Sequence, residues 1–217
     1  MTRVVLCYGD SNTHGTPPMP NLGFVGRHGP DDRWPGVMAR ALVPDWTVIE
    51  EGLPGRTTVH DDPLEGAHKN GRMVLPAILE THAPLDLVIV KLGANDLKAR
   101  FSLTAQDIAF GAGKLLDVIR VVAPTAAILL VAPPPITESG CLAEMFAGGA
   151  VKSARLGALM ATEARARGAG FLDAGAHVAV DPVDGIHYAA LAHHTLGRAV
   201  ATLIGQLWPS SGHDGRA

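Results

Sequence analysis

The chain has 217 residues, of which 47% are hydrophobic, and its formal net charge at pH 7 is −3. This length is that of one domain and is sufficient to bury a core. We therefore expect a single domain over residues 1–208, followed by a polar, frayed tail over residues 209–217. The net charge is small and no block of like charges occurs, which argues against nucleic acid as a partner.

The sequence also predicts where the protein works. No apolar run approaches the length of a bilayer span, and the run after Met1 is too short for the core of a signal peptide. The two cysteines, Cys7 and Cys141, lack any metal-like spacing, so we expect two reduced thiols. These features predict a cytoplasmic protein without a membrane span.

Five short apolar runs alternate with segments of helical periodicity, which is the order of a parallel sheet flanked by helices. The predicted strands are Val4–Tyr8, Trp46–Ile49, Leu87–Val90, Ala127–Val131 and Ala169–Leu172. The predicted helices are Trp34–Val43, Arg72–Thr81, Ala105–Val122, Val151–Arg167 and Ala189–Trp208. The sequence therefore predicts an α/β fold in three layers, α/β/α.

Glycine and proline are concentrated in three segments that we expect to be loops, residues 12–33, 51–71 and 132–149. Two further short glycine motifs follow the first and third predicted strands directly, at Gly9 and Gly93. In open α/β sheets, ligands bind at the carboxyl ends of the strands. The functional residues are therefore expected near these two positions.

Ser11, in Gly9-Asp10-Ser11-Asn12, is the candidate nucleophile, and His187, in Asp184-Gly185-Ile186-His187, is the candidate base. A serine hydroxyl needs a histidine to take its proton and a carboxylate to orient that histidine. Asp184 lies three residues before His187, a spacing at which two side chains can meet within one turn. Asp181 is the competing carboxylate, but it lies six residues away.

Four blocks of sequence together resemble the SGNH hydrolases, also called the GDSL esterase/lipase family. They are Gly9-Asp10-Ser11-Asn12, residues 52–58, Gly93-Ala94-Asn95-Asp96 and Asp184-Gly185-Ile186-His187. The resemblance implies a flavodoxin-like fold with a five-stranded parallel sheet. Further segments resemble the bacterial arylesterase and acyltransferase branch. Its members hydrolyse short-chain and aryl esters and can pass the acyl group to alcohols or hydrogen peroxide.

The same resemblance implies an oxyanion hole built from the backbone N–H of Ser11, the backbone N–H of Gly55 and the side-chain amide of Asn95. Such fixed donors typically supply about 2.7–4 kcal/mol each. Taken alone, Gly55 is equally typical of a turn, and Asn95 of a helix cap. Asp96 is expected to be a cap or a support for the loop.

The chain departs from the arylesterase branch beside Ser11, where Asn12-Thr13-His14-Gly15 replaces the Leu-Thr-Trp-Gly of those relatives. Loss of the indole removes a large apolar wall, so we expect a wider or more polar pocket. The residues expected to bind substrate are Asp10, Asn12, His14, Pro134, Met145, Phe146 and Ile186.

We expect no cofactor and no metal. The pair His193-His194 and the group His60, Asp61, Asp62 and His68 lack the spacing of metal ligands, and solvated side chains explain them better. The expected partner is a small ester, and the branch resemblance implies a homo-oligomer. Two alternatives remain open: a carbohydrate O-acetyl esterase, and a non-catalytic flavodoxin-like binding module, for which no phosphate-binding motif is present.

Overall fold

The structure of the protein is a computed structural model that describes residues 2–209. Apart from Pro209, the predicted tail lies outside the described residues. None of the helices within residues 2–209 has the length and apolar character needed to cross a membrane.

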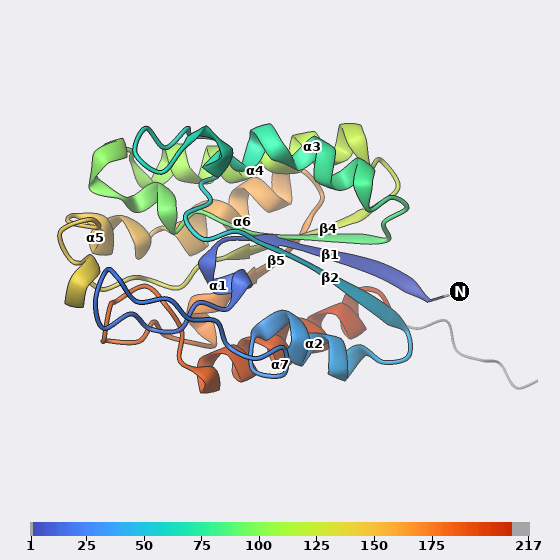
Figure 1. The fold of residues 1–217 in the computed structure, drawn as a ribbon. Helices are drawn as coiled ribbons and strands as arrows, with labels where there is room; N and C mark the ends of the chain where they lie inside the picture. Colours follow the sequence, from blue (N-terminus) through green and yellow to red (C-terminus); the bar gives the residue numbers. More distant parts are fainter. Residues whose placement is uncertain (1, 210–217) are drawn as a thin grey trace, which may run out of the picture.

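A sheet of five parallel strands forms the centre of the molecule (Figure 1), with the strand order β2-β1-β3-β4-β5. This is the flavodoxin-like order. The strands are β1 (Arg3–Gly9), β2 (Trp46–Gly52), β3 (Leu87–Lys91), β4 (Ala127–Ala132) and β5 (Gly170–Asp173). All five predicted strands are present, each shifted by no more than three residues at either end.

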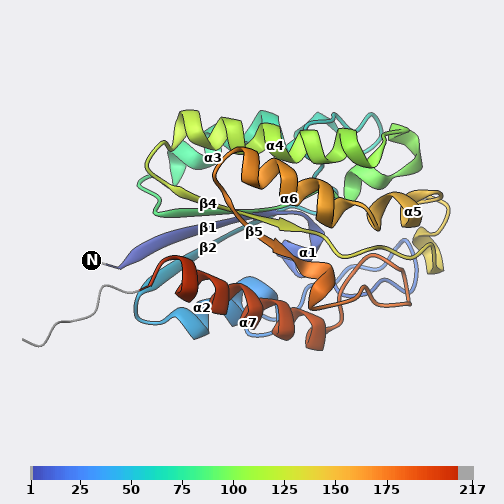
Figure 2. The ribbon, with the colours of Figure 1, turned by 180° about the vertical axis from the view of Figure 1, so that it is seen from behind.

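Helices cover both faces of this sheet, as Figures 1 and 2 show: α3, α4 and α6 lie on one face, and α2 and α7 on the other. The helices are α1 (Ser11–His14), α2 (Trp34–Leu42), α3 (Gly71–Thr81), α4 (Ala105–Val122), α5 (Gly149–Ser153), α6 (Leu156–Ala166) and α7 (Ala190–Leu207). The predicted three-layer α/β/α fold is confirmed.

Alternation along β1 explains why its run is continuously apolar. Leu6 and Tyr8 belong to the core beneath α3, α4 and α6, whereas Val5 and Cys7 belong to the core beneath α2 and α7. Successive side chains of a strand point to opposite faces, so both faces of a covered sheet demand apolar residues. Burial raises the pKa of the Cys7 thiol well above its usual value, which is consistent with the expected reduced, unreactive cysteine.

Two predictions about helices were wrong. Residues 11–14 form the short helix α1 instead of a loop, and the predicted helix over residues 151–167 is divided into α5 and α6. A four-residue helix is too short to show periodicity. The division follows Ser153, whose Oγ accepts a hydrogen bond from Ile136 N at 3.0 Å and so ties the end of α5 to the preceding loop.

Candidate active site

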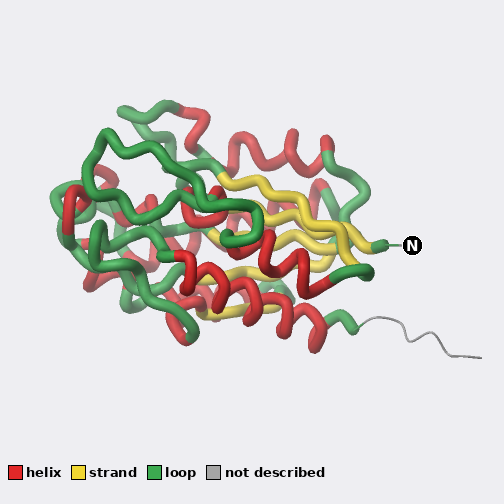
Figure 3. Tube along the Cα trace, turned by 60° about the horizontal axis from the view of Figure 1, so that its bottom comes forward, coloured by secondary structure: helices red, strands yellow, loops and turns green. Residues whose placement is uncertain are grey.

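Long loops gather at the end of the molecule opposite the N-terminus, beyond the carboxyl ends of the strands (Figure 3). Ser11 begins α1 there, directly after β1. Asp10 caps this helix, because its Oδ1 accepts a hydrogen bond from Asn12 N at 3.0 Å. Gly15, with φ of 88°, ends it in the left-handed conformation.

Two glycines allow α1 to lie directly on the sheet. A Cβ at Gly9 would lie 2.0 Å from Thr13 Oγ1, and a Cβ at Gly52 would lie 2.1 Å from His14 N. Neither contact is possible for a residue with a side chain, so both strands must end in glycine for the helix to approach this closely. This packing fixes the position of the Ser11 side chain.

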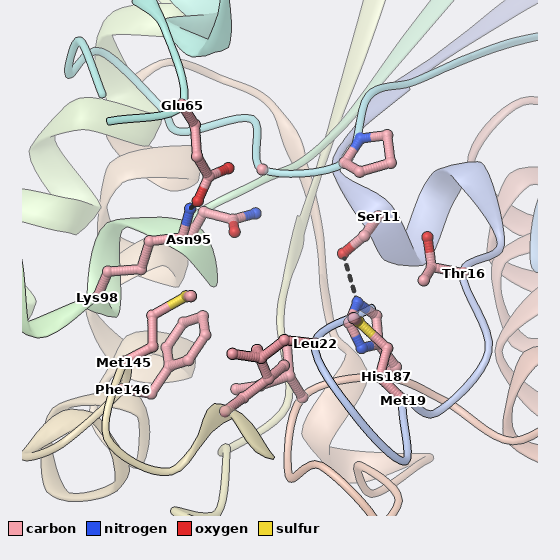
Figure 4. Close-up of a pocket in the computed structure, with 14 residues that line it drawn as sticks. Ser11, Thr16, Met19, Leu22, Glu65, Asn95, Lys98, Met145, Phe146 and His187 are labelled. Atoms are coloured by element: carbon pink, nitrogen blue, oxygen red, sulfur yellow. Dashed lines mark hydrogen bonds and ion pairs between the residues drawn. The ribbon is translucent and has the colours of Figure 1, made fainter. Parts of the chain in front are cut away.

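The side chain of His187 meets that of Ser11 at the carboxyl end of the sheet. Its Nε2 lies 3.0 Å from Ser11 Oγ (Figure 4), and its Nδ1 lies 2.7 Å from Asp184 Oδ2. All three side chains are buried. Ser11 and His187 are 176 positions apart in the sequence, so the fold brings together the two halves of the predicted triad.

Asp184 is fully buried and surrounded by donors. Its Oδ1 accepts hydrogen bonds from Ile186 N and His187 N at 2.9 Å, and its Oδ2 accepts one from Met19 N at 2.6 Å. Burial opposes ionisation, but the hydrogen bonds from His187 and Met19 outweigh it and lower the pKa of Asp184. The carboxylate is therefore held charged beside the imidazole.

Asp181, the competing carboxylate, does not contact the imidazole. Its Oδ1 accepts a hydrogen bond from Val183 N at 2.9 Å, and its own backbone N donates to the carbonyl of His187 at 2.8 Å. Asp181 therefore shapes the loop that carries His187, and Asp184 is the residue placed to orient the ring.

Gly55 and Asn95 lie on the cavity beside Ser11. Gly55 has a φ of 80° and follows Pro54, whose carbonyl accepts a hydrogen bond from Lys69 Nζ at 2.9 Å. Gly55 therefore forms the expected turn and also lines the cavity. Asn95 is not a helix N-cap, since it lies inside a 3-10 helix over Asn95–Leu97.

Asp96 supports the loop instead of capping it. The residue is buried, and its carboxylate accepts hydrogen bonds from Thr58 N at 3.0 Å and from Thr58 Oγ1 at 2.5 Å. Burial raises the pKa of Asp96 despite these donors. Asp96 therefore joins the second and third sequence blocks beneath the cavity.

Arg56 is a structural residue of the site to which the sequence analysis gave no role. Its guanidinium lies 4.1 Å from the centre of the Tyr8 ring and donates to the carbonyl of Gly9 at 2.9 Å. Its own carbonyl accepts a hydrogen bond from Asn95 Nδ2 at 3.1 Å. Arg56 thus ties the end of β1, through its buried side chain, to the loop of Asn95, through its backbone carbonyl.

A cavity of about 320 Å³ opens over Ser11 and His187 (Figure 4). Of the residues predicted to bind substrate, Met145, Phe146 and Ile186 line it. Its lining also includes residues without a predicted role: Thr16, Met19, Leu22, Pro54, Glu65 and Lys98. Most of these come from loops, where no periodicity signals which side chain points inward.

The other four residues predicted to bind substrate lie outside the cavity lining. Asp10 caps α1, and Asn12 Nδ2 donates to the carbonyl of Ile186 at 3.1 Å. His14 turns toward Thr16 Oγ1, 3.2 Å from its Nδ1, and Pro134 is buried beside Gly175. His14 therefore meets the cavity only through Thr16, which lines it, and the predicted part of His14 in shaping the pocket stays a prediction.

The expectation of solvated side chains was wrong for His193 and Asp62, which are both buried. His193 packs against His28 and Tyr188, with ring centres 5.0 and 5.3 Å away. Asp62 lies in a cluster of charged residues beside the cavity. Within residues 2–209, no group of three or more potential metal ligands occurs.

Residues 7–195 match the model of the GDSL-like lipase/acylhydrolase family. The chain belongs to this family. The predicted resemblance is thereby confirmed over nearly the full described length, and the four sequence blocks all fall within the matched residues. No curated protein matches the sequence of this chain.

Solved structures of similar proteins have the same fold. The carbohydrate acetylesterase Est24 from Sinorhizobium meliloti is 39% identical, with a TM-score of 0.92, and the match covers 95% of this chain and 100% of that one. The aryl esterase of M. smegmatis is also 39% identical, with a TM-score of 0.91 and the same coverage. A putative arylesterase from Agrobacterium tumefaciens str. C58 is 36% identical, with a TM-score of 0.84, over 94% and 99% of the two chains.

Proposed function

We propose that this protein, a carboxylic ester hydrolase by its family, cleaves short-chain acyl or aryl esters through an acyl-enzyme on Ser11. The observation that carries the proposal is the buried chain of contacts from Ser11 Oγ to His187 Nε2, and from His187 Nδ1 to Asp184 Oδ2. A side-chain triad of this kind needs no cofactor.

The reaction follows from this geometry. Ser11 Oγ forms a bond to the ester carbon while its proton passes to His187 Nε2, and the carbonyl oxygen becomes an oxyanion. The N–H groups of Ser11 and Gly55 and the Asn95 amide are the proposed donors to this oxyanion. When the C–O bond breaks, His187 returns the proton to the leaving alcohol, and water then hydrolyses the acyl-enzyme with His187 again as base.

The test is replacement of the nucleophile. Ser11→Ala should abolish hydrolysis of p-nitrophenyl acetate, with a loss of about 10⁶-fold in kcat, while circular dichroism shows an unchanged fold. Ser139→Ala is the matched control, because Ser139 lies on a loop outside the cavity lining and should keep wild-type activity. Retention of activity by Ser11→Ala would refute the proposal.

A carbohydrate O-acetyl esterase is the second candidate. It is supported by the charged side chains of Glu65 and Lys98 in the cavity lining and by the similarity to a carbohydrate acetylesterase. Both candidates use the same triad and differ in the alcohol that leaves. Comparing kcat/KM for acetylated sugars and aryl acetates would separate them.

From the resemblance to the arylesterase and acyltransferase branch we also propose acyl transfer and homo-oligomeric assembly. A cytoplasmic location is proposed from the sequence. Large exposed apolar side chains support assembly: Leu22, which lines the cavity, is 65% exposed, Val25 95% and Leu64 78%. Sedimentation velocity would test it, and transfer would appear as the yield of new ester when an alcohol competes with water.

A further inference from the structure

One side of the cavity carries charge. Figure 4 shows Ser11 and His187 on one side, with Glu65, Asn95 and Lys98 on the side that faces them. The remaining lining is largely apolar and includes Met19, Leu22, Leu142, Met145, Phe146 and Ile186. The charged pair therefore interrupts a pocket that otherwise suits hydrocarbon groups.

The pair belongs to a cluster of two acids and two bases. Lys98 Nζ donates to Glu65 Oε1 and lies 3.3 Å from Asp62 Oδ2, while Arg100 lies 3.2 Å from oxygens of both acids. The side chain of Lys98 is only 2% exposed and that of Asp62 is 0% exposed. The opposite charges balance, and Glu65 and Lys98 are the two members of the cluster that line the cavity.

Glu65 is the member of this cluster that combines contact with the cavity and partial solvation. Its side chain is 32% exposed, and Oε1 is held by Lys98 and Arg100. The other oxygen, Oε2, lies against Gly55, since a Cβ at that glycine would be 2.3 Å from it. Glu65 therefore borders the proposed oxyanion hole directly.

The chemistry of the triad fixes which part of the substrate meets this wall. The leaving oxygen must lie near His187 Nε2, which protonates it, and the carbonyl oxygen must point toward Gly55 and Asn95. The acyl group takes the remaining direction at the tetrahedral carbon, away from His187. The acyl group therefore extends into the cavity, whose facing side carries Glu65 and Lys98.

A longer acyl chain must then push methylene groups against a carboxylate that keeps part of its water. Burial of an apolar group is favourable only where it displaces water from apolar surface, and removing water from a charged group without a new hydrogen bond is unfavourable. An acetyl group stops before this contact, whereas a butyryl or hexanoyl chain reaches it.

We propose that Glu65, held by Lys98, ends the acyl subsite and limits the enzyme to acetyl esters, whatever the alcohol. This inference rests on the proposed acyl-enzyme at Ser11. Glu65 is thus a specificity-determining residue for the acyl group.

The experiment measures kcat/KM for p-nitrophenyl acetate, butyrate and hexanoate. The wild-type protein should prefer acetate to hexanoate by roughly 100-fold, and Glu65→Met should raise the hexanoate-to-acetate ratio by roughly tenfold or more. Glu65→Gln keeps the size and a polar amide but removes the charge, so it should raise the ratio by a smaller factor. If Glu65→Met fails to fold, the hexanoate-to-acetate ratio of Glu65→Gln alone tests the inference.

Glu144→Met is the matched control, because Glu144 is an exposed carboxylate outside the cavity lining and should leave the ratio unchanged. An unchanged ratio in folded Glu65→Gln and Glu65→Met would overturn the inference. A wild-type protein with Ser11-dependent activity and no preference for acetate would also overturn it, while the proposed function would stand. Absence of hydrolysis of all three esters by the wild type would overturn both.

Discussion

Two buried histidines lie six residues apart in this protein and have opposite surroundings. His187 is 4% exposed and His193 is 0% exposed. His187 is flanked by the Asp184 carboxylate and the Ser11 hydroxyl. Among the residues that the structure describes, no carboxylate bonds to His193: its Nδ1 accepts a hydrogen bond from Trp34 N at 3.3 Å, and its ring packs against His28 and Tyr188.

The surroundings of the two imidazoles differ in charge. Burial, the neighbouring His28 and the Lys91 ammonium lower the pKa of His193 to about 3, so this ring is neutral near pH 7. Asp184 gives His187 what His193 lacks, a fixed negative charge, which in the proposed mechanism stabilises the imidazolium. Burial alone therefore does not distinguish the proposed base from His193; the buried carboxylate beside His187 does.

Among tests of this comparison, the largest expected effect comes from removing that carboxylate. Asp184→Asn keeps the shape but replaces an acceptor of the Nδ1 proton with an amide that favours the wrong tautomer, so kcat should fall about 10⁴-fold. Hydrolysis of p-nitrophenyl acetate measures this. Asp181→Asn is the control and should stay close to wild-type activity; a larger loss in Asp181→Asn than in Asp184→Asn would reverse the assignment.

The second test concerns His193 and changes the neighbouring Lys91. Lys91 is 1% exposed, and its Nζ lies 4.8 Å from the centre of the Tyr188 ring. Burial opposes its charge, but Tyr188 and Asp10 outweigh burial and raise the pKa of Lys91. Lys91→Met leaves the buried Asp10 carboxylate without this cation, so the free energy of unfolding should fall by about 3 kcal/mol.

Urea unfolding measures this loss, and the pKa of His193, followed by NMR, should rise in Lys91→Met because a neighbouring positive charge is gone. The double variant Asp10→Asn/Lys91→Met should recover part of the lost stability. Unchanged stability and an unchanged His193 titration would show that Lys91 does not act on either group.

The smallest expected effect is a pH dependence of stability. The pKa of His193 is about 3 in the folded protein and about 6.5 in the unfolded chain, so the unfolded chain binds more protons between these values. The stabilising contribution is therefore complete above pH 6.5 and is lost as pH falls toward 3, by up to about 1.4 kcal/mol per pH unit.

In His193→Gln this contribution is absent, so the difference in unfolding free energy between pH 6 and pH 4 should shrink by about 2 kcal/mol. Urea unfolding at the two pH values measures it. The Asp184 carboxylate, whose pKa is lowered from 3.8, contributes its own acid sensitivity below this window. An equal pH dependence in both proteins would refute the assignment to His193.

The sequence predicted the fold and the contacts of Asp184, His187 and Ser11 for physical reasons. Apolar runs such as Leu87–Val90 reflect burial on both faces, and the spacing of Asp184 and His187 is local enough to imply contact. The position of Ser11 after the first strand places it at the ligand-binding edge. These signals depend on neighbouring residues or on the order of elements, and both are visible in a sequence.

The walls of the cavity could not be predicted in this way. Met19 reaches the site because its backbone N donates to Asp184, 165 positions away, and Glu65 reaches it through Lys98 and Arg100 on another loop. His193 differs from the solvated histidine that was expected because α7 packs its face against α2. Contacts between distant loops produce no periodic pattern in the sequence of either loop.

The paired glycines at positions 9 and 52 have a practical consequence for engineering this enzyme. They leave no free volume beneath the nucleophile, so even alanine at either position would displace α1 and misalign Ser11. Mutagenesis libraries aimed at new ester preferences should therefore hold both positions constant and randomise other residues of the cavity lining, such as Leu22, Met145 and Phe146. Catalytic alignment and substrate range are, in this molecule, separately tunable properties.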